Sequence, residues 1–122
     1  MNNYLNLIGR ILLAQIFIIA GIGKITGYAG TAAYMAAMGV PGALLPLVIL
    51  LELGGGLLLI IGWKTKWVAL ALAAFCIVAG LIFHHNFADM TQKIMFMKNL
   101  AIAGGFLILA MSGPGALSVD KK

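Results

Sequence analysis

The sequence predicts an all-α fold, a four-helix transmembrane bundle with a short interfacial helix between the first two spans. Of its 122 residues, 63% are hydrophobic and 9% are charged, and the mean hydropathy is +1.11. Soluble domains carry about 25% charged residues, so this composition indicates an integral membrane protein. Because one crossing needs about 20 residues, the chain has room for four helices and little else.

Two further observations favour a tightly packed helical bundle. The 16 glycines are numerous for soluble helices, but small residues let membrane helices approach closely. The apolar segments do not alternate with polar residues, which argues against a membrane barrel. The net charge of +5 comes from basic residues that lie singly or in pairs at helix ends. That distribution is typical of membrane topology and does not indicate a nucleic-acid partner.

We interpret the whole chain, residues 1–122, as one membrane domain. The alanine- and methionine-rich stretch after the first span is too short to cross a bilayer, and Tyr34 suits the headgroup level. It is therefore the predicted interfacial helix, at about residues 29–38. The predicted spans cover about residues 5–25, 42–62, 67–83 and 93–111.

The lysine and arginine distribution predicts the orientation. With four crossings, both termini and the turn at residues 63–66 lie on one side of the membrane. That side carries more basic residues, Arg10, Lys64, Lys66, Lys121 and Lys122, than the other, which carries Lys24, Lys93 and Lys98. Cytoplasmic sides are enriched in lysine and arginine, so both termini are predicted to be cytoplasmic.

Glu52 is the residue that most needs an explanation. It is the one ionisable side chain in the apolar stretch at residues 44–62, and a charge at mid-membrane costs about 2.5–3.5 kcal/mol on insertion scales. Its depth along the helix predicts Lys98 as its first partner and Arg10 as its second, with Asn99 at the Lys98 level. Arg10 shares an inward face of the first span with Lys24 at helical spacing.

Two interpretations of this polar group remain open. The network around Glu52 either fixes helix register or forms a pocket for a proton, a quinone headgroup or a small solute. Gly55 and Gly56 follow one turn after Glu52, and they either admit a neighbouring helix or leave space for a ligand.

The sequence contains no clear metal or thiol centre. His85 and Asp89, spaced i and i+4, are the weak candidates for metal ligands, and two groups on a loop do not predict a site. Cys76 is the single cysteine, so an internal disulfide is excluded, and we expect it to be a small buried hydrophobic residue. No residue is assigned a catalytic role, and enzymatic activity is left undecided.

The chain resembles the DoxX family of small bacterial inner-membrane proteins over nearly its whole length. The resemblance lies in Gly39-Val40-Pro41, in Glu52 with its glycines, in Lys98-Asn99, and in GPGALSVD near the C-terminus. In the first span it includes Arg10, Phe17, Gly21 and Lys24. The resemblance therefore implies a multi-pass protein of the bacterial inner membrane.

The family resemblance also implies a function. Members of the DoxX family are associated with a terminal quinol oxidase, with thiosulfate:quinone oxidoreductase and with oxidative-stress complexes. It implies an accessory or redox-linked subunit near the quinone pool, with quinone as the candidate cofactor and other membrane redox proteins, or copies of itself, as partners. Two alternatives are a non-enzymatic partner or assembly factor for another membrane protein, and a small-solute carrier.

Overall fold

Four long apolar helical spans and one short helix make up most of the described part of the chain. The computed structural model describes residues 2–84 and 88–120, and all regular structure in these ranges is helical. This confirms the predicted all-α fold, with helices long and apolar enough to cross a membrane at 3–26, 42–61, 65–83 and 90–112. The elements are α1 (Asn2–Thr26), α2 (Tyr28–Ala37), η1 (Gly42–Leu44), α3 (Leu45–Ile49), η2 (Leu50–Gly54), α4 (Gly55–Ile61), α5 (Thr65–Phe83) and α6 (Met90–Ser112).

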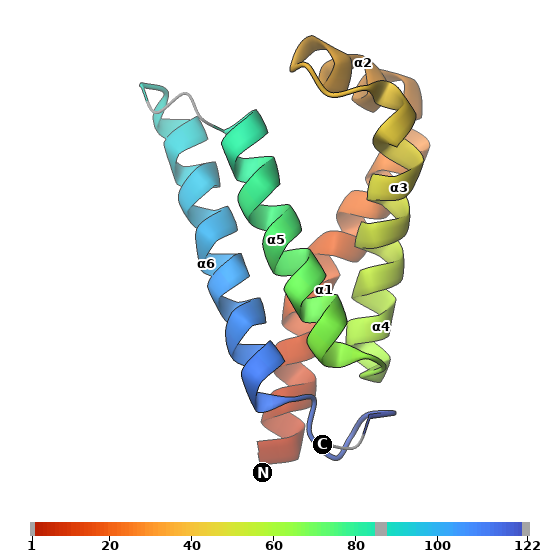
Figure 1. Cartoon of the computed structure of the whole chain (residues 1–122), viewed down its shortest axis with the longest axis vertical. Helices are drawn as coiled ribbons and strands as arrows, with labels where there is room; N and C mark the ends of the chain where they lie inside the picture. The colour runs from red at the N-terminus through yellow and green to blue at the C-terminus, as the bar shows by residue number, and fades with distance from the viewer. Residues whose placement is uncertain (1, 85–87, 121–122) are drawn as a thin grey trace.

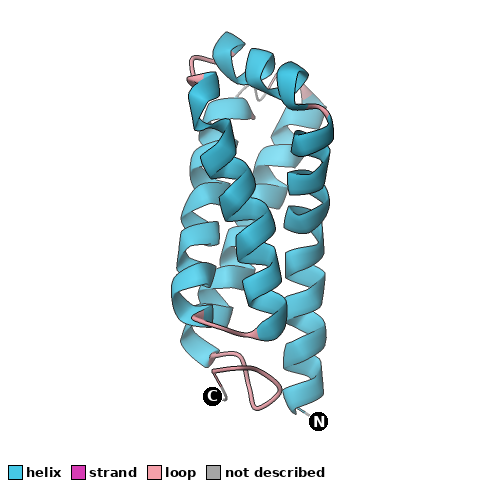
Figure 2. Cartoon of the chain, turned by 90° about the vertical axis from the view of Figure 1, so that its right-hand side faces the viewer, coloured by secondary structure: helices cyan, strands magenta, loops and turns pink. Residues whose placement is uncertain are grey.

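The spans are arranged as two helix pairs that meet at one end and diverge at the other. Figure 1 shows α5 and α6 side by side, and the span from α3 to α4 on the other side of α1. The two groups approach each other near the chain ends and separate towards α2. Figure 2 shows α2 lying across the opposite end of the bundle from the termini. The membrane-crossing part is therefore closed at one end and wider at the other.

The helix bounds follow local chemistry. After α2, Gly39 adopts a φ of +84°, a left-handed conformation that glycine tolerates best. Helix α6 begins at Met90, three residues earlier than the predicted 93, because the Asp89 carboxylate accepts a hydrogen bond of 2.9 Å from the Thr91 N–H. This N-cap lets the polar residues before Lys93 continue the helix.

The core is small and lies along the bundle axis. Phe17 of α1 and Phe106 of α6 pack with ring centroids 5.4 Å apart, next to buried Leu59 and Leu72. In the most apolar stretch of each span, only 22–28% of the residues are buried inside the protein. The outward side chains are mostly large and apolar, which suits contact with lipid.

The C-terminal segment folds back on the end of the bundle where the chain begins. Val119 and Asp120 donate backbone hydrogen bonds of 2.9 Å to Ile61 and Gly62. The Asp120 carboxylate accepts hydrogen bonds from the Lys64 N–H at 3.0 Å and the Thr65 N–H at 2.8 Å. Residue 120 therefore caps α5, although 55 positions separate it from Thr65.

We expect Asp120→Ala to lower the free energy of unfolding by about 1 kcal/mol, because α5 loses its cap. Asp120→Asn keeps one acceptor oxygen, so its free energy of unfolding should lie between those of Asp120→Ala and the unmodified protein. Thermal unfolding in detergent measures both. Equal stabilities for Asp120→Ala and the unmodified protein would show that α5 does not depend on this cap.

Candidate functional site

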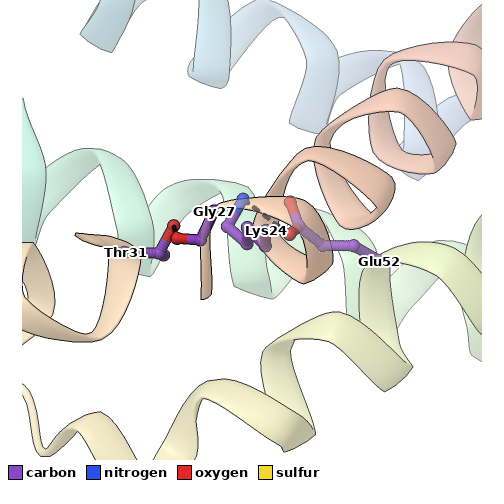
Figure 3. Close-up of polar contacts among 4 residues, drawn as sticks. All are labelled: Lys24, Gly27, Thr31 and Glu52. Atoms are coloured by element: carbon purple, nitrogen blue, oxygen red, sulfur yellow. Dashed lines mark hydrogen bonds and ion pairs between the residues drawn. The ribbon is translucent and has the colours of Figure 1, made fainter. Parts of the chain in front are cut away.

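The centre of the candidate site is an ion pair between α1 and η2. Lys24 Nζ lies 2.7 Å from Glu52 Oε1, and the two side chains are 27% and 5% exposed. Figure 3 shows them approaching each other from separate helices, with Gly27 and Thr31 nearby. Within the described ranges, Lys24 is the one charged partner of Glu52. A buried carboxylate thus has its charge balanced inside the membrane.

Side-chain direction explains why these two residues meet. The span that contains Glu52 runs antiparallel to α1, and a helical side chain leans towards the N-terminus of its own helix. Lys24 therefore leans into the bundle while Glu52 leans towards the α2 end. Gly21 enables the approach, because a Cβ at that position would lie 3.1 Å from the Cβ of Leu53.

Glu52 is held by a π-helical turn, η2, which interrupts the second span between α3 and α4. Such turns are rare, and they occur frequently at functional sites. The added residue per turn changes the register between the two halves of the span. The prediction of one regular helix over residues 42–62 missed this turn.

The predicted pairing of Glu52 with Lys98 is wrong. Lys98 is exposed on α6, whereas its neighbour Asn99 is partly buried and faces α5. Depth along a helix gives axial height but not rotation about the helix axis. Adjacent residues point about 100° apart, so Asn99 faces inward and Lys98 faces the surroundings.

The predicted pairing with Arg10 is also wrong, because Arg10 has other partners at the closed end of the bundle. Its Nη1 donates to the carbonyls of Leu59 at 2.9 Å and Ile60 at 2.7 Å. Its Nη2 donates to the Leu117 carbonyl at 2.5 Å, and its Nε donates to Asn6 at 3.0 Å. Arg10 is fully buried. It joins α1 to the end of α4 and to the C-terminal segment, so the sequence correctly placed it inward but assigned the wrong contacts.

A cavity of about 490 Å³ adjoins the Lys24–Glu52 pair in the wider half of the bundle. Most of its wall is apolar. The polar or titratable side chains on that wall are Lys24, Thr31, Tyr34, Glu52, Cys76, His84 and Asn99. A concave, largely apolar space with a few convergent polar groups is the usual form of a small-molecule site.

Several cavity residues were not predicted as site residues. Tyr34 of α2 stacks on Phe83 of α5 with centroids 5.4 Å apart, and both line the cavity. His84 Nδ1 lies 3.0 Å from Gln92 Oε1. Of the predicted site residues, Glu52, Lys24 and Asn99 reach this cavity. Cys76 is 3% exposed, as expected, and its carbonyl accepts a hydrogen bond of 3.2 Å from Asn99 Nδ2.

Gly55 and Gly56 form helix contacts instead of lining the cavity. A Cβ at Gly56 would lie 2.7 Å from Ile18 Cγ1 and 3.2 Å from the Ala14 carbonyl oxygen. A Cβ at Gly55 would meet Leu72 at 3.4 Å. Of the two interpretations left open by the sequence, these glycines therefore support close helix packing.

We expect Gly56→Ala to destabilise the protein by about 1–3 kcal/mol, since the added methyl group overpacks the contact between α1 and α4. Gly104→Ala is the matched control, because a Cβ at that position on α6 would have no heavy atom of a neighbouring element within 4 Å. That control should leave stability unchanged or raise it by up to about 1 kcal/mol. The unfolding midpoints of the two variants are compared in detergent. Equal changes in midpoint for Gly56→Ala and Gly104→Ala would refute the packing argument.

The weak metal candidates are not brought together by the structure. His85 lies outside the described residues, and Asp89 caps α6. Within the described ranges, no group of three or more histidine, cysteine, aspartate or glutamate side chains has a metal-binding arrangement.

Comparison with known proteins identifies the family. The DoxX family model matches residues 5–85, which cover most of α1 and all of α2 to α5. The chain belongs to the DoxX family. No solved structure matches it.

Two bacterial relatives of this DoxX chain indicate the cellular location. The inner membrane protein YqjF of Escherichia coli K12 is 58% identical over 115 residues, covering 94% of this chain and 88% of the relative. YphA, another E. coli inner membrane protein, is 39% identical, covering 95% and 88%. The yeast ER-derived vesicles protein ERV29 is 32% identical over 79 residues, covering 61% of this chain and 26% of the relative.

With its four apolar spans, this DoxX chain is therefore a multi-pass inner-membrane protein. The structure puts both ends of the described chain at the same end of the bundle. Their location on the cytoplasmic side stays a prediction.

Proposed function

We propose that this protein binds a quinone in the cavity beside Lys24 and Glu52 and acts as an accessory subunit of an inner-membrane redox system. The observation that carries the proposal is an apolar cavity of about 490 Å³ with a buried ion pair in its wall. A quinone is an apolar, membrane-soluble molecule with a small polar ring, so it matches both features. When bound, it supplies two-electron redox chemistry.

The residues of this chain fit such a ligand. The side chain of Glu52 is 5% exposed, and Lys24 is the one group paired with its Oε1 within the described residues. A carboxylate can accept about four hydrogen bonds, so a buried carboxylate with one partner in a cavity wall favours a polar ligand group beside it. Ile16, Val78 and Met95 line the cavity and have exposed side chains. Those residues give a membrane-dissolved ligand an apolar route into the site.

An accessory role is favoured over independent electron transfer. The chain has a single cysteine, Cys76, so it has no internal disulfide with which to exchange electrons. In this proposal Glu52 orients the polar ring and Lys24 balances the charge of Glu52. The apolar wall excludes water, and a partner protein supplies the redox centre.

The two alternative functions have less support. An assembly factor would present an open small-residue groove, but Gly55 and Gly56 are covered by Leu72 and Ile18. A small-solute carrier needs a polar path, whereas the cavity wall is mostly apolar.

Thermal unfolding with and without decylubiquinone tests the proposal. A ligand present at 100 times its Kd stabilises the folded state by about 2.7 kcal/mol, so we expect the unfolding midpoint to rise by several degrees. Ala79→Phe should abolish the rise because Ala79 lines the cavity. Ala74→Phe, on the exposed side of the same helix, should retain it. The proposal fails if the unmodified protein shows no rise, or if Ala79→Phe responds as strongly as Ala74→Phe.

A further inference from the structure

Hydrogen-bond donors in the cavity wall are already engaged within the protein. Asn99 Nδ2 donates to the Cys76 carbonyl at 3.2 Å, and Thr31 Oγ1 donates to the Gly27 carbonyl at 3.0 Å. Lys24 directs its ammonium group at Glu52 from 2.7 Å. A ligand entering the cavity therefore meets few side-chain donors at the level of Glu52.

The hydrogen-bond acceptor in the cavity wall, Glu52, has fewer partners than it can accept. Glu52 Oε1 is buried, and within the described residues its one pairing with a donor is the 2.7 Å ion pair with Lys24. An ionised carboxylate has about four acceptor positions, so this single pairing leaves it able to accept more hydrogen bonds. A carboxylate accepts hydrogen bonds and donates none. The group that best completes this site is therefore a hydroxyl or another donor on the ligand.

Lys24 does not supply the ligand with a free hydrogen-bond donor. It has further protons, but its ammonium group must stay beside Glu52 to compensate the buried carboxylate. Three polar or titratable side chains on the wall remain. The Cys76 thiol is only a weak donor. Tyr34 and His84 lie on α2 and just after the end of α5, at the wider end of the bundle.

We infer that the cavity selects a headgroup that donates a hydrogen bond to Glu52, and so binds the reduced, hydroxyl-bearing quinol more tightly than the oxidised quinone. This inference rests on the proposed function. An oxidised ring presents only carbonyl acceptors, which would face the carboxylate without a shared proton. A quinol hydroxyl donates to the same oxygen, and hydrogen bonds to charged groups are the stronger ones.

Binding of two ligand pairs to the unmodified protein in detergent tests the inference. The first pair is decylubiquinol, kept reduced under anaerobic conditions, and decylubiquinone. The second is 4-decylphenol and its methyl ether, which differ in the hydroxyl donor and take no part in redox chemistry. We expect the donor-bearing member of each pair to bind at least about tenfold more tightly. Equal affinities within both pairs, or tighter binding of the acceptor-only members, would overturn the inference.

Glu52→Gln provides a second test. The variant removes the negative charge and releases the Lys24 ammonium to donate to a carbonyl. The quinol should therefore lose affinity while the quinone gains it, which narrows or reverses the preference. An unchanged preference for quinol over quinone in a folded Glu52→Gln variant would show that Glu52 does not determine which headgroup binds.

The outcomes separate this inference from the proposed function. If quinol and quinone bind equally, the redox-state preference fails and the quinone site stands. If only the alkylphenol binds and neither quinone form does, donor selection stands and the proposed function fails. If no ligand binds, both fail.

Discussion

Replacing Arg10 with methionine will destabilise the folded protein by about 3–5 kcal/mol, through the loss of several buried hydrogen bonds. Methionine fills similar space but cannot donate to the carbonyls of Leu59, Ile60 and Leu117, which Arg10 pairs at distances of 2.5–2.9 Å. Each buried carbonyl left without a donor costs about 1–3 kcal/mol, and partial relaxation keeps the total below the sum. The C-terminal segment loses its link to α1 at the same time.

Chemical unfolding in detergent and limited proteolysis measure this effect. We expect Arg10→Met to unfold at a lower denaturant concentration and to be cleaved faster in the C-terminal segment. Arg10→Lys should be intermediate, because an ammonium group lacks the planar fork that serves several carbonyls together. Lys98→Met, at an exposed position, is the control and should unfold like the original protein. If Arg10→Met is as stable as Lys98→Met, the anchoring role of Arg10 is wrong.

Lys24→Met will destabilise the protein by about 3 kcal/mol, the lower end of the range for breaking a buried pair, because Lys24 is 27% exposed. The substitution leaves the Glu52 carboxylate buried without its counter-charge. Removing the charge as well, in Lys24→Met with Glu52→Gln, should recover most of the loss, since two neutral side chains have no uncompensated charge.

A double-mutant cycle on unfolding free energies checks this prediction. The expected signature is a double variant that is more stable than Lys24→Met alone. Lys98→Met in place of Lys24→Met should show no coupling to Glu52→Gln. Additive losses for Lys24 and Glu52, or coupling between Lys98 and Glu52, would contradict the assigned pairing.

These substitutions act at opposite ends of the bundle. Arg10 and the C-terminal segment hold the end where α4 and α5 meet. Lys24 and Glu52 connect α1 to the second span where the helix pairs have begun to diverge. Because the hydrogen bonds at the closed end hold the helices together, the other end can keep a cavity without losing the fold. Arg10→Met should therefore lower the stability of the fold, whereas Ala79→Phe should abolish ligand binding.

Composition and hydropathy were sufficient to predict the fold. Long apolar segments have one main solution in a bilayer, because each backbone amide must be paired inside its own segment. The same reasoning identified Glu52 as an exceptional residue and placed Arg10 on an inward face with Lys24. These results need only the helical period and the cost of burying charge.

The tertiary structure determined which charged groups meet. Residue spacing gives the height of Lys98 in the membrane, but the rotation of α6 turns that side chain outward and Asn99 inward. The Gly21–Leu53 contact and the π-helical turn at Leu50–Gly54 bring Glu52 to Lys24. Packing between whole helices sets this rotation and register, so local sequence does not encode them.

The sequence by itself thus determined a helical membrane bundle with one buried acid that needs a partner. Only the tertiary structure decided that Lys24 is this partner, that Arg10 anchors the C-terminal segment, and that Gly55 and Gly56 are packed. It also decided that a cavity lies beside Glu52. The physical reason is that burial cost belongs to a residue and its own helix, whereas pairing and empty space depend on how several helices are rotated against one another.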